Sequence, residues 1–433
     1  MLVPRPYQEE AIGGVRGEIS SGLRRVLLVI ATGGGKTFTA AKIIEMAISK
    51  GKKCIFLAHR KELIDQCSKT LDALGIDHGV IKRGHSRNDR SKLVQVASIQ
   101  TLIKRAHWEA DLIVIDEAHR SIAKTYVDII ARYDADKIVV LGLTATPYRM
   151  DGRPLGRHFD ADGVEKSIFG YDSIVEVIDP QELVAQGFLI EPTVFSASNP
   201  DLSKLKLGSR GDYTEESNAE AMENIILHGE LLVNWAKICG GALGADTHFI
   251  EVPIDEDGKE IQGDLFVHDI PDRKTRTRVV STNCDACTVI FAPNIAESKR
   301  IIQQFQDAGV PSAHVDGEMS EKERSRILQG LEDRTIHVVS NVNILTEGWD
   351  LPHLECVIGA RLTRSKSLYK QMGGRVMRPD DDKRFGYILD HANWTRTHGF
   401  LCDPCEHSLE GREKRPRKGG AGAIGRASCR ERV

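Results

Sequence analysis

The segment Ala31–Thr37 reads ATGGGKT and joins an apolar run to a helix-like run. Three consecutive glycines let backbone N–H groups converge on phosphate oxygens without Cβ clashes, and the following helix would present its N-terminus to the anion. Lys36 can bridge the β- and γ-phosphates of a nucleotide, and Thr37 can hold Mg²⁺ through its hydroxyl. Ile30 replaces the first glycine of the general P-loop pattern, but the flanking runs still favour a phosphate cradle over an incidental turn.

The segment Asp116-Glu117-Ala118-His119 comes directly after the apolar run 112–115. Two acidic residues therefore stand at the end of a predicted strand. Strand ends are where α/β sheets place ligand groups. Asp116 would hold Mg²⁺ through water, and Glu117 would orient and deprotonate an attacking water. The pair is a weak motif alone, but it stands at a strand end about 80 residues after the glycine turn.

Two further segments could sense or stabilise a phosphate. Thr144 and Thr146, in TATP after the next apolar run, could report the state of a γ-phosphate; a strand terminated by Thr and Pro is the alternative. Near the far end, QMGGRVMR places Arg375 and Arg378 at helical i, i+3 spacing, so both can face one direction. An arginine finger stabilises charge on a transferring phosphoryl group, whereas a lone R-x-x-R would be a solvated basic face.

Apolar runs alternating with helical stretches predict βαβ units and parallel sheets. The expected strands of the first domain are 26–30, 54–58, 93–97, 112–115 and 138–143, with a helix at 37–50 and a last helix at 180–186. Those of the second are 288–292, 313–315, 336–340, 356–359 and 387–389, with helices at 297–308 and 321–331. A joint is expected after about Asp151 and a linker at 196–211.

An insertion at about 240–285 precedes the second set of strands. Its segments 248–254 and 260–267 flank Asp255-Glu256-Asp257-Gly258, which predicts a β-hairpin. Surface decoration is the favoured interpretation. The expected domains are therefore 1–190 and 191–395, followed by a basic tail at 396–423.

Composition and charge limit which classes of protein the chain can belong to. The 433 residues are 41% hydrophobic and 28% charged, and no apolar run approaches the length of a membrane span. The start of the chain has no signal-peptide core, and nine scattered cysteines favour reduced thiols and a cytoplasmic location. A net charge of −3 neither supports nor excludes nucleic acid, because a basic footprint can be local.

Together these motifs resemble superfamily-two helicases of the DEAD/DEAH-box class over about residues 2–395. The collinear set is RPYQ from Arg5, ATGGGKT, LAHRKEL from Leu57, ASIQTL from Ala97, DEAH, TATP, FAPN from Phe291, ILTEGWDLP from Ile344 and QMGGRVMR. Within the class, RPYQ, HRKEL, TEGWDLP and the tail from Ser408 look most like the bacterial and phage RadD/UvsW-type DNA repair branch. The resemblance implies two tandem RecA-like domains that bind ATP and Mg²⁺ between them.

The resemblance also implies roles for individual residues. The nucleotide would be held by Arg5, Gln8 at the adenine edge, Thr32, Gly33, Gly34, Gly35, Lys36, Thr37, Gly348 and Asp350. Coupling would pass through His119, Thr144, Thr146 and Gln371, and nucleic acid would contact His59, Arg60, Lys61, Ser98, Gln100, Thr101, Asn294 and Thr346. Phosphate contacts of this kind carry no sequence information, so sequence-independent binding is expected.

We therefore expect an ATP-driven motor on nucleic acid, with DNA favoured over RNA. The alternatives are a double-strand translocase, the motor of a restriction complex, or an ATP-gated binding module with little turnover. Intact Glu117 and both arginines argue against the last of these.

Two cysteine pairs and the C-terminal residues are the remaining features of the sequence. Cys284/Cys287 and Cys402/Cys405 are two Cys-x-x-Cys pairs, with His407 near the second, but thiols without metal are favoured over zinc. Residues 412–418 form a basic tail that either adds phosphate affinity or solubilises the end. Residues 424–433, IGRASCRERV, match one reading frame of a widely used sequencing adapter, so we expect Cys429 to be foreign and the natural C-terminus to be missing.

Overall fold

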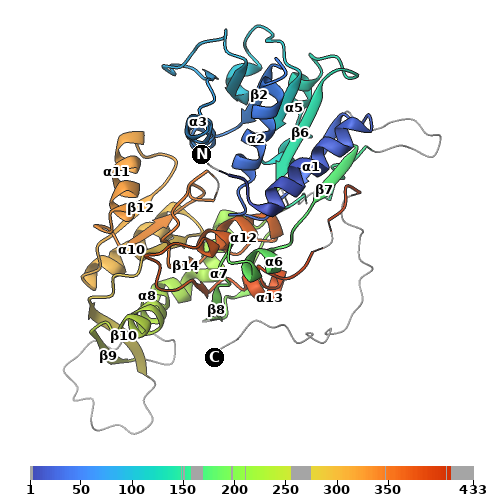
Figure 1. Ribbon diagram of the computed structural model, residues 1–433. Helices are drawn as coiled ribbons and strands as arrows, with labels where there is room; N and C mark the ends of the chain where they lie inside the picture. Colours follow the sequence, from blue (N-terminus) through green and yellow to red (C-terminus); the bar gives the residue numbers. More distant parts are fainter. Residues whose placement is uncertain are drawn as a thin grey trace.

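The computed structural model describes residues 3–147, 149, 152–157, 169–196, 198–209, 211–254, 275–346, 348–405 and 407–410. Within these residues two parallel sheets lie one above the other in Figure 1, each flanked by helices. The expected α/β architecture of two tandem domains is confirmed. The basic tail 412–418, the adapter-like end and the predicted turn at 255–258 lie outside the described residues.

The first sheet has the spatial order β3-β4-β2-β5-β6-β1-β7, and every neighbouring pair is parallel. Its strands are β1 (Arg25–Val29), β2 (Cys54–Ala58), β3 (Gly79–Ile81), β4 (Val94–Ser98), β5 (Leu112–Ile115), β6 (Val139–Thr144) and β7 (Ser173–Glu176). Its helices are α1 (Pro6–Ser20), α2 (Lys36–Ile48), α3 (Lys61–Ala73), α4 (Ile99–Leu102), α5 (Lys124–Ile130) and α6 (Pro180–Ala185).

Alternate residues of each central strand serve opposite faces of the first sheet. In β1, Val26 and Leu28 join the core beneath α1, α2 and α3, whereas Leu27 and Val29 join a second core with α4 and α5. All four are almost fully buried. A strand buried on both faces reads as a continuous apolar run, which is why the five central strands were predicted within one or two residues.

The second sheet has the order β12-β13-β11-β14-β15-β8 and is also parallel. Its strands are β8 (Thr193–Ser196), β11 (Thr288–Phe291), β12 (Ser312–Val315), β13 (Val338–Asn341), β14 (Cys356–Gly359) and β15 (Tyr387–Asp390). Its helices are α7 (Glu215–Leu227), α8 (Glu230–Trp235), α9 (Gly241–Leu243), α10 (Ile295–Asp307), α11 (Glu321–Glu332), α12 (Lys366–Gly373) and α13 (Trp394–His398).

Two boundaries differ from the sequence expectation. β7 pairs with β1, so the first sheet continues past the joint expected after Asp151. β8 pairs with β15, so the segment 196–211 follows a strand of the second sheet and is not the interdomain linker. The chain instead crosses between the sheets from β7 to β8 through α6. β7 and β8 are edge strands of four residues each, too short to leave a clear apolar run.

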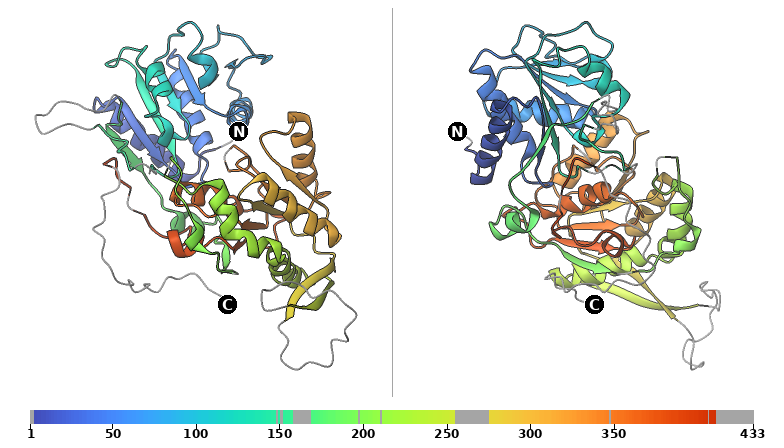
Figure 2. Two further views of the ribbon diagram at one scale, coloured as in Figure 1. Left: turned by 180° about the vertical axis from the view of Figure 1, so that it is seen from behind. Right: turned by 90° about the vertical axis from the view of Figure 1, so that its right-hand side faces the viewer.

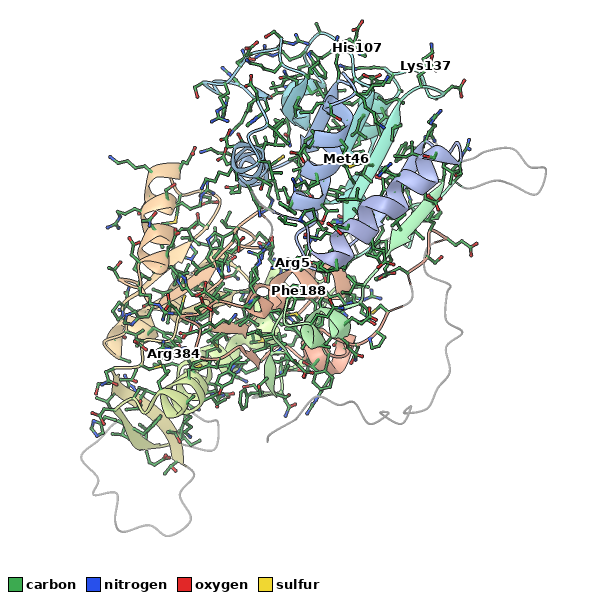
Figure 3. The ribbon with its side chains drawn as sticks, viewed as in Figure 1. Arg5, Met46, His107, Lys137, Phe188 and Arg384 are labelled. Atoms are coloured by element: carbon green, nitrogen blue, oxygen red, sulfur yellow. The ribbon has the colours of Figure 1, made fainter. Side chains whose placement is uncertain are left out.

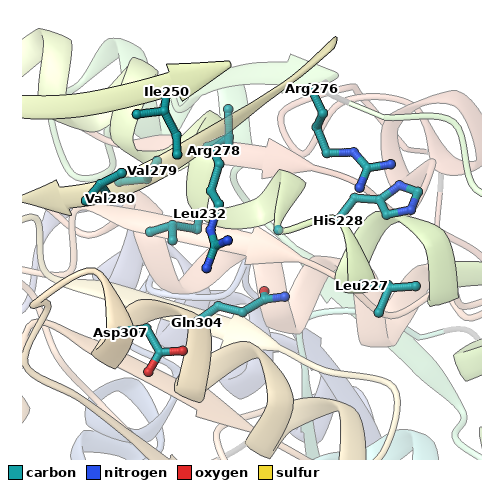
Figure 4. A pocket seen from close by; sticks show the side chains of 12 residues that line it. Leu227, His228, Leu232, Ile250, Arg276, Arg278, Val279, Val280, Gln304 and Asp307 are labelled. Atoms are coloured by element: carbon teal, nitrogen blue, oxygen red, sulfur yellow. The ribbon is translucent and has the colours of Figure 1, made fainter. Parts of the chain in front are cut away.

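The insertion is a two-stranded antiparallel ribbon. β9 (Thr247–Pro253) pairs along its length with β10 (Thr275–Thr282), whereas the second arm expected at 260–267 lies outside the described residues. The ribbon projects from the lower end of the second domain (Figure 2). A groove of about 620 Å³ lies beside it, lined by exposed Leu227, Ile250 and Val280 with Arg276 and Arg278 (Figure 4). No described helix is long and apolar enough to cross a bilayer.

Candidate active site in the interdomain cleft

The glycine turn joins β1 to α2, which begins at Lys36. Gly33 and Gly35 adopt positive φ angles of 85° and 81°, a conformation that favours glycine. A Cβ on Gly34 would lie 2.6 Å from Ile30 Cγ2, and one on Gly35 would lie 2.5 Å from Gln8 Nε2. The turn therefore depends on glycine at all three positions, and it leaves the cradle that a polyphosphate needs at a helix N-terminus.

Residues of α1 support this turn from behind. The Tyr7 hydroxyl donates to the carbonyl of Gly34 (2.8 Å), and Gln8 Nε2 donates to the same oxygen (3.4 Å). Gln8 Oε1 accepts from the backbone N–H of Arg5 (2.9 Å). The Gln8 amide thus joins the start of α1 to the glycine turn.

Lys36 is half-buried, and its Nζ donates to the carbonyl of Ile30 (3.4 Å). Burial lowers the pKa of this ammonium; Glu117 and Asp116 oppose the shift, and Arg375 and Arg378 add to it. At Lys36 the effect of burial therefore outweighs that of the two carboxylates. An anion bound in the cradle would favour the charged form of this amine.

Asp116 and Glu117 follow β5 and are both buried, with 5% and 8% of their surface exposed. Asp116 Oδ1 accepts from the backbone N–H of Glu117 (3.0 Å). Glu117 has φ 51° and ψ 55°, a left-handed conformation that non-glycine residues adopt rarely and often at functional sites. Both residues line the cleft between the domains.

The cleft itself, of about 310 Å³, is built from both domains. The first domain contributes Arg5, Thr32, Gly33, Gly35, Lys36, Thr37, Asp116, Glu117 and Phe188, and the second contributes Gly348, Asp350, Gln371, Arg375 and Arg378. The structure thus brings together residues more than 300 positions apart in the chain, Lys36 and Arg378 among them.

Magnesium fits this donor set. Thr37 and Asp116 line the same cleft and offer the oxygen atoms that Mg²⁺ prefers. The described residues contain no cluster of three or more His, Cys, Asp or Glu side chains that could hold a metal alone. A magnesium ion here would therefore share its ligands with phosphate and water, as it commonly does.

Helix α12 makes two polar contacts across the domain boundary. Gln371 Nε2 donates to Glu117 Oε2 (3.2 Å), and the hydroxyls of Ser367 and Thr146 are 2.5 Å apart. Thr144 Oγ1 in turn accepts from the backbone N–H of Thr146 (3.0 Å). His119 Nδ1 lies 3.3 Å from the Glu117 oxygen that Gln371 contacts. The four predicted coupling residues therefore lie at or beside the domain boundary.

Both predicted arginines are anchored to the segment 346–350. Arg375 donates to the carbonyls of Thr346 (2.6 Å) and Trp349, and Arg378 forms an ion pair with Asp350. A Cβ on Gly33 would lie 3.5 Å from Arg378 Cγ, so this side chain packs directly over the glycine turn. Burial lowers the pKa of Arg378 to about 10, which still leaves it charged at neutral pH.

Comparison with known families matches the two sheets separately. The family described as "Type III restriction enzyme, res subunit" matches residues 1–149, and "Helicase conserved C-terminal domain" matches residues 273–380. The putative ATP-dependent helicase IRC3 of Saccharomyces cerevisiae is 29% identical over 405 residues, covering 90% of this chain and 51% of IRC3.

Both matched segments are similar to the domains of superfamily-two helicases.

Restriction enzymes are also among the proteins that this chain resembles. The endonuclease subunit of the type I restriction enzyme EcoKI of Escherichia coli is 26% identical over 429 residues, covering 89% of this chain and 34% of that subunit. The solved structure of the Type ISP restriction-modification enzyme LlaBIII bound to DNA shares the fold, with a TM-score of 0.57, 20% identity, and coverage of 90% of this chain and 28% of that one. The chain thus spans about half or less of the length of these proteins.

The predicted nucleic-acid residues lie at strand ends and helix starts, and several of them form hydrogen bonds within the chain. Gln100 Nε2 donates to the carbonyl of His59 (3.1 Å), and Ser98 Oγ donates to Gln100 Oε1 (2.8 Å). Asn294 Oδ1 caps α10 by accepting from the N–H of Glu297 (2.8 Å). Thr101 follows Gln100 in α4.

Other predicted nucleic-acid residues bridge the two domains. Arg60 donates to the carbonyls of Asn343 (3.1 Å) and Ile344 (3.3 Å), and Lys61 forms an ion pair with Glu321 of α11. Thr346 is buried, and its carbonyl accepts from Arg375. Arg60 and Lys61 therefore hold the domains together in this structure, a role that their sequence context did not indicate.

Phe188 was missed by the sequence analysis. Its ring lies 4.5 Å below the Arg5 guanidinium carbon and 5.4 Å from the Tyr7 ring, and it lines the cleft. Figure 3 shows Arg5 and Phe188 together at the boundary between the domains. No motif surrounds Phe188 in the sequence, so only the fold brings it to Arg5.

The cysteine pairs lie in different surroundings. Burial raises the pKa of Cys284, Cys287 and Cys402 to about 12. Cys405 instead accepts from Lys366 Nζ (3.0 Å), while His407 Nδ1 lies 2.6 Å from Glu176 Oε1. No described trio of potential zinc ligands forms around either pair.

Proposed function

We propose that this chain couples ATP hydrolysis to movement along nucleic acid, with DNA as its substrate. The observation that carries the proposal is the cleft that places Lys36 and Glu117 opposite Gln371 and Arg378. Such a site is complete only while the domains are together. Loss of the γ-phosphate would remove a shared contact and let them separate.

Each side of the cleft has a defined part in hydrolysis. Lys36 would bind the β- and γ-phosphates above the glycine turn, and Glu117 would orient the attacking water. Arg375 and Arg378 would stabilise charge on the γ-phosphoryl group. Thr37 and Asp116 would hold Mg²⁺, which neutralises phosphate charge when bound.

The adenine would lie near Arg5 and Phe188. The guanidinium already stacks on the ring at the edge of the cleft, and an adenine is another flat π-system that such a pair can hold. Gln8 is close enough to the glycine turn to connect base recognition to phosphate binding.

DNA is favoured over RNA, with a place in the RadD/UvsW-type repair branch, because the RPYQ and TEGWDLP segments resemble that branch. The direct test compares ATPase stimulation by single-stranded DNA, forked DNA and RNA. Stimulation by RNA alone would contradict DNA as the substrate.

Glu117→Gln tests the proposed base. This variant should bind ATP as tightly as the unmodified chain while its turnover falls by about 10²- to 10⁴-fold. Glu109→Gln makes the same chemical change at an exposed residue and should leave turnover unchanged. A Glu117→Gln variant that hydrolyses ATP at the native rate would remove Glu117 from this role.

A second candidate is a double-strand translocase that never separates strands, as in the motor of a restriction complex. The matches to restriction-enzyme subunits favour it. Displacement of a third strand from a triplex, without unwinding of forked DNA, would identify this activity. Unwinding of the fork would identify a helicase.

A further inference from the structure

The ammonium group of Lys383 contacts the main chain that carries Arg378. Lys383 stands in the turn before β15, and its Nζ donates to the carbonyls of Val376 and Arg378 (2.8 Å for Arg378). A longer contact of 3.5 Å reaches the carbonyl of Pro352, beyond Asp350 in the segment that pairs with Arg378. The Lys383 side chain thus connects the main chain around Arg378 with the segment that contains Asp350 and Pro352.

These carbonyls need a partner because the helical ladder ends here. The turn 374–377 is a short 3₁₀ helix, and Arg378 is extended, with φ −73° and ψ 132°. The last carbonyls of a helix have no partner within it. Lys383 Nζ donates to the carbonyls of Val376 and Arg378. The backbone N–H of Ile190 donates to the carbonyl of Met377 (2.7 Å). All three consecutive carbonyls are therefore held.

We propose that Lys383 is a positioning residue for Arg378, fixing the backbone from which the guanidinium reaches the phosphate. The inference rests on the proposed ATP hydrolysis. Lys383 is absent from the residues that line the cleft, so it acts through the main chain of Arg378. Misplacement of a catalytic group by about 1 Å can cost about 100-fold in rate, so a loosened anchor should lower turnover more than binding.

The ionisation of Lys383 gives a second readout. Burial lowers its pKa to about 8, and Arg378 adds to the shift, while Glu355, Asp380 and Cys287 oppose it. Above this pH the amine loses its charge and one N–H donor. The anchor then weakens, so turnover should fall as the pH rises past about 8.

The experiment compares Lys383→Met and Lys383→Arg with Lys137→Met, which lies at the far end of the first domain in Figure 3. We expect Lys383→Met to lower kcat about 10- to 100-fold while the Kd for a fluorescent ATP analogue changes less than about threefold. Lys383→Arg should recover most of kcat and lose the fall above pH 8. Lys137→Met should match the unmodified chain.

A double variant separates positioning from general destabilisation. If Lys383 acts through Arg378, adding Lys383→Met to Arg378→Ala should lower kcat no further. An equal further loss in that background would overturn the proposal, as would native kcat in Lys383→Met. If Lys383→Met does not fold, Lys383→Arg decides: an unchanged alkaline fall would contradict the inference. Absence of ATPase in the unmodified chain would instead contradict the proposed function.

Discussion

The side-chain amide of Gln371 donates to the carboxylate of Glu117 across the domain boundary, with 3.2 Å between Nε2 and Oε2. The two residues are 254 positions apart in the chain. In our proposal Glu117 activates water, so this contact lets the second domain control the orientation of the base. Closure of the cleft would therefore also orient Glu117 toward the attacking water.

Gln371→Leu should uncouple these events. Leucine has similar bulk but no donor, so the Glu117 carboxylate would lose its partner and its fixed orientation. We expect kcat to fall about tenfold, the effect of about 1.4 kcal/mol, with little change in the Kd for ATP. Gln303→Leu, at an exposed position on α10, is the control. Equal steady-state ATPase rates in both variants would contradict this role for Gln371.

Gly34→Ala tests whether the tight turn has room for any side chain larger than that of glycine. The new Cβ would lie 2.6 Å from Ile30 Cγ2 and 3.1 Å from the carbonyl of Ala31, so the turn must shift. We expect loss of ATP binding and destabilisation by about 1–3 kcal/mol, measured by nucleotide titration and urea unfolding. Gly13→Ala is the control, because no atom lies within 4 Å of its added Cβ; equal behaviour of the two would argue against a tight turn.

The depressed pKa of Lys36 predicts proton uptake on ATP binding. Phosphates favour the charged amine, so binding should raise this pKa, and ATP affinity should fall as the pH rises through the lowered value. Calorimetry in buffers of different ionisation enthalpy measures the uptake, and Lys36→Arg should abolish it. Proton uptake that persists in Lys36→Arg would assign it to another group.

The lowered pKa of Lys36 also makes the free energy of unfolding depend on pH. Between the lowered folded-state pKa and 10.5, the folded chain binds fewer protons at Lys36 than the unfolded chain does. The contribution of Lys36 to the free energy of unfolding therefore increases as the pH rises through this window.

The sequence predicted the central strands and the motif residues for a common physical reason. Buried parallel strands are continuous apolar runs, and functional groups follow their ends, so Lys36 and Glu117 could be found from local patterns. β3, β7 and β8 are short edge strands, and the sequence analysis did not predict them. Their apolar signal lasts only a few residues.

Other features depended on contacts between distant segments. Phe188 reaches the cleft only because the chain crosses between the sheets beside Arg5. Arg60 contacts carbonyls 283 and 284 positions away, and nothing near it in the sequence indicates this. Lys383 looks like an ordinary surface lysine until the 3₁₀ turn that it supports is known.

Turnover of Arg378→Ala tests the central claim most directly, since Arg378 belongs to the second domain but packs over Gly33 of the first. Rapid-mixing ATPase assays at saturating ATP and DNA would give kcat, with the Kd for ATP measured separately. We predict that kcat falls about 10³- to 10⁵-fold while ATP still binds. Hydrolysis at the native rate would show that one domain suffices and would contradict a shared ATP site.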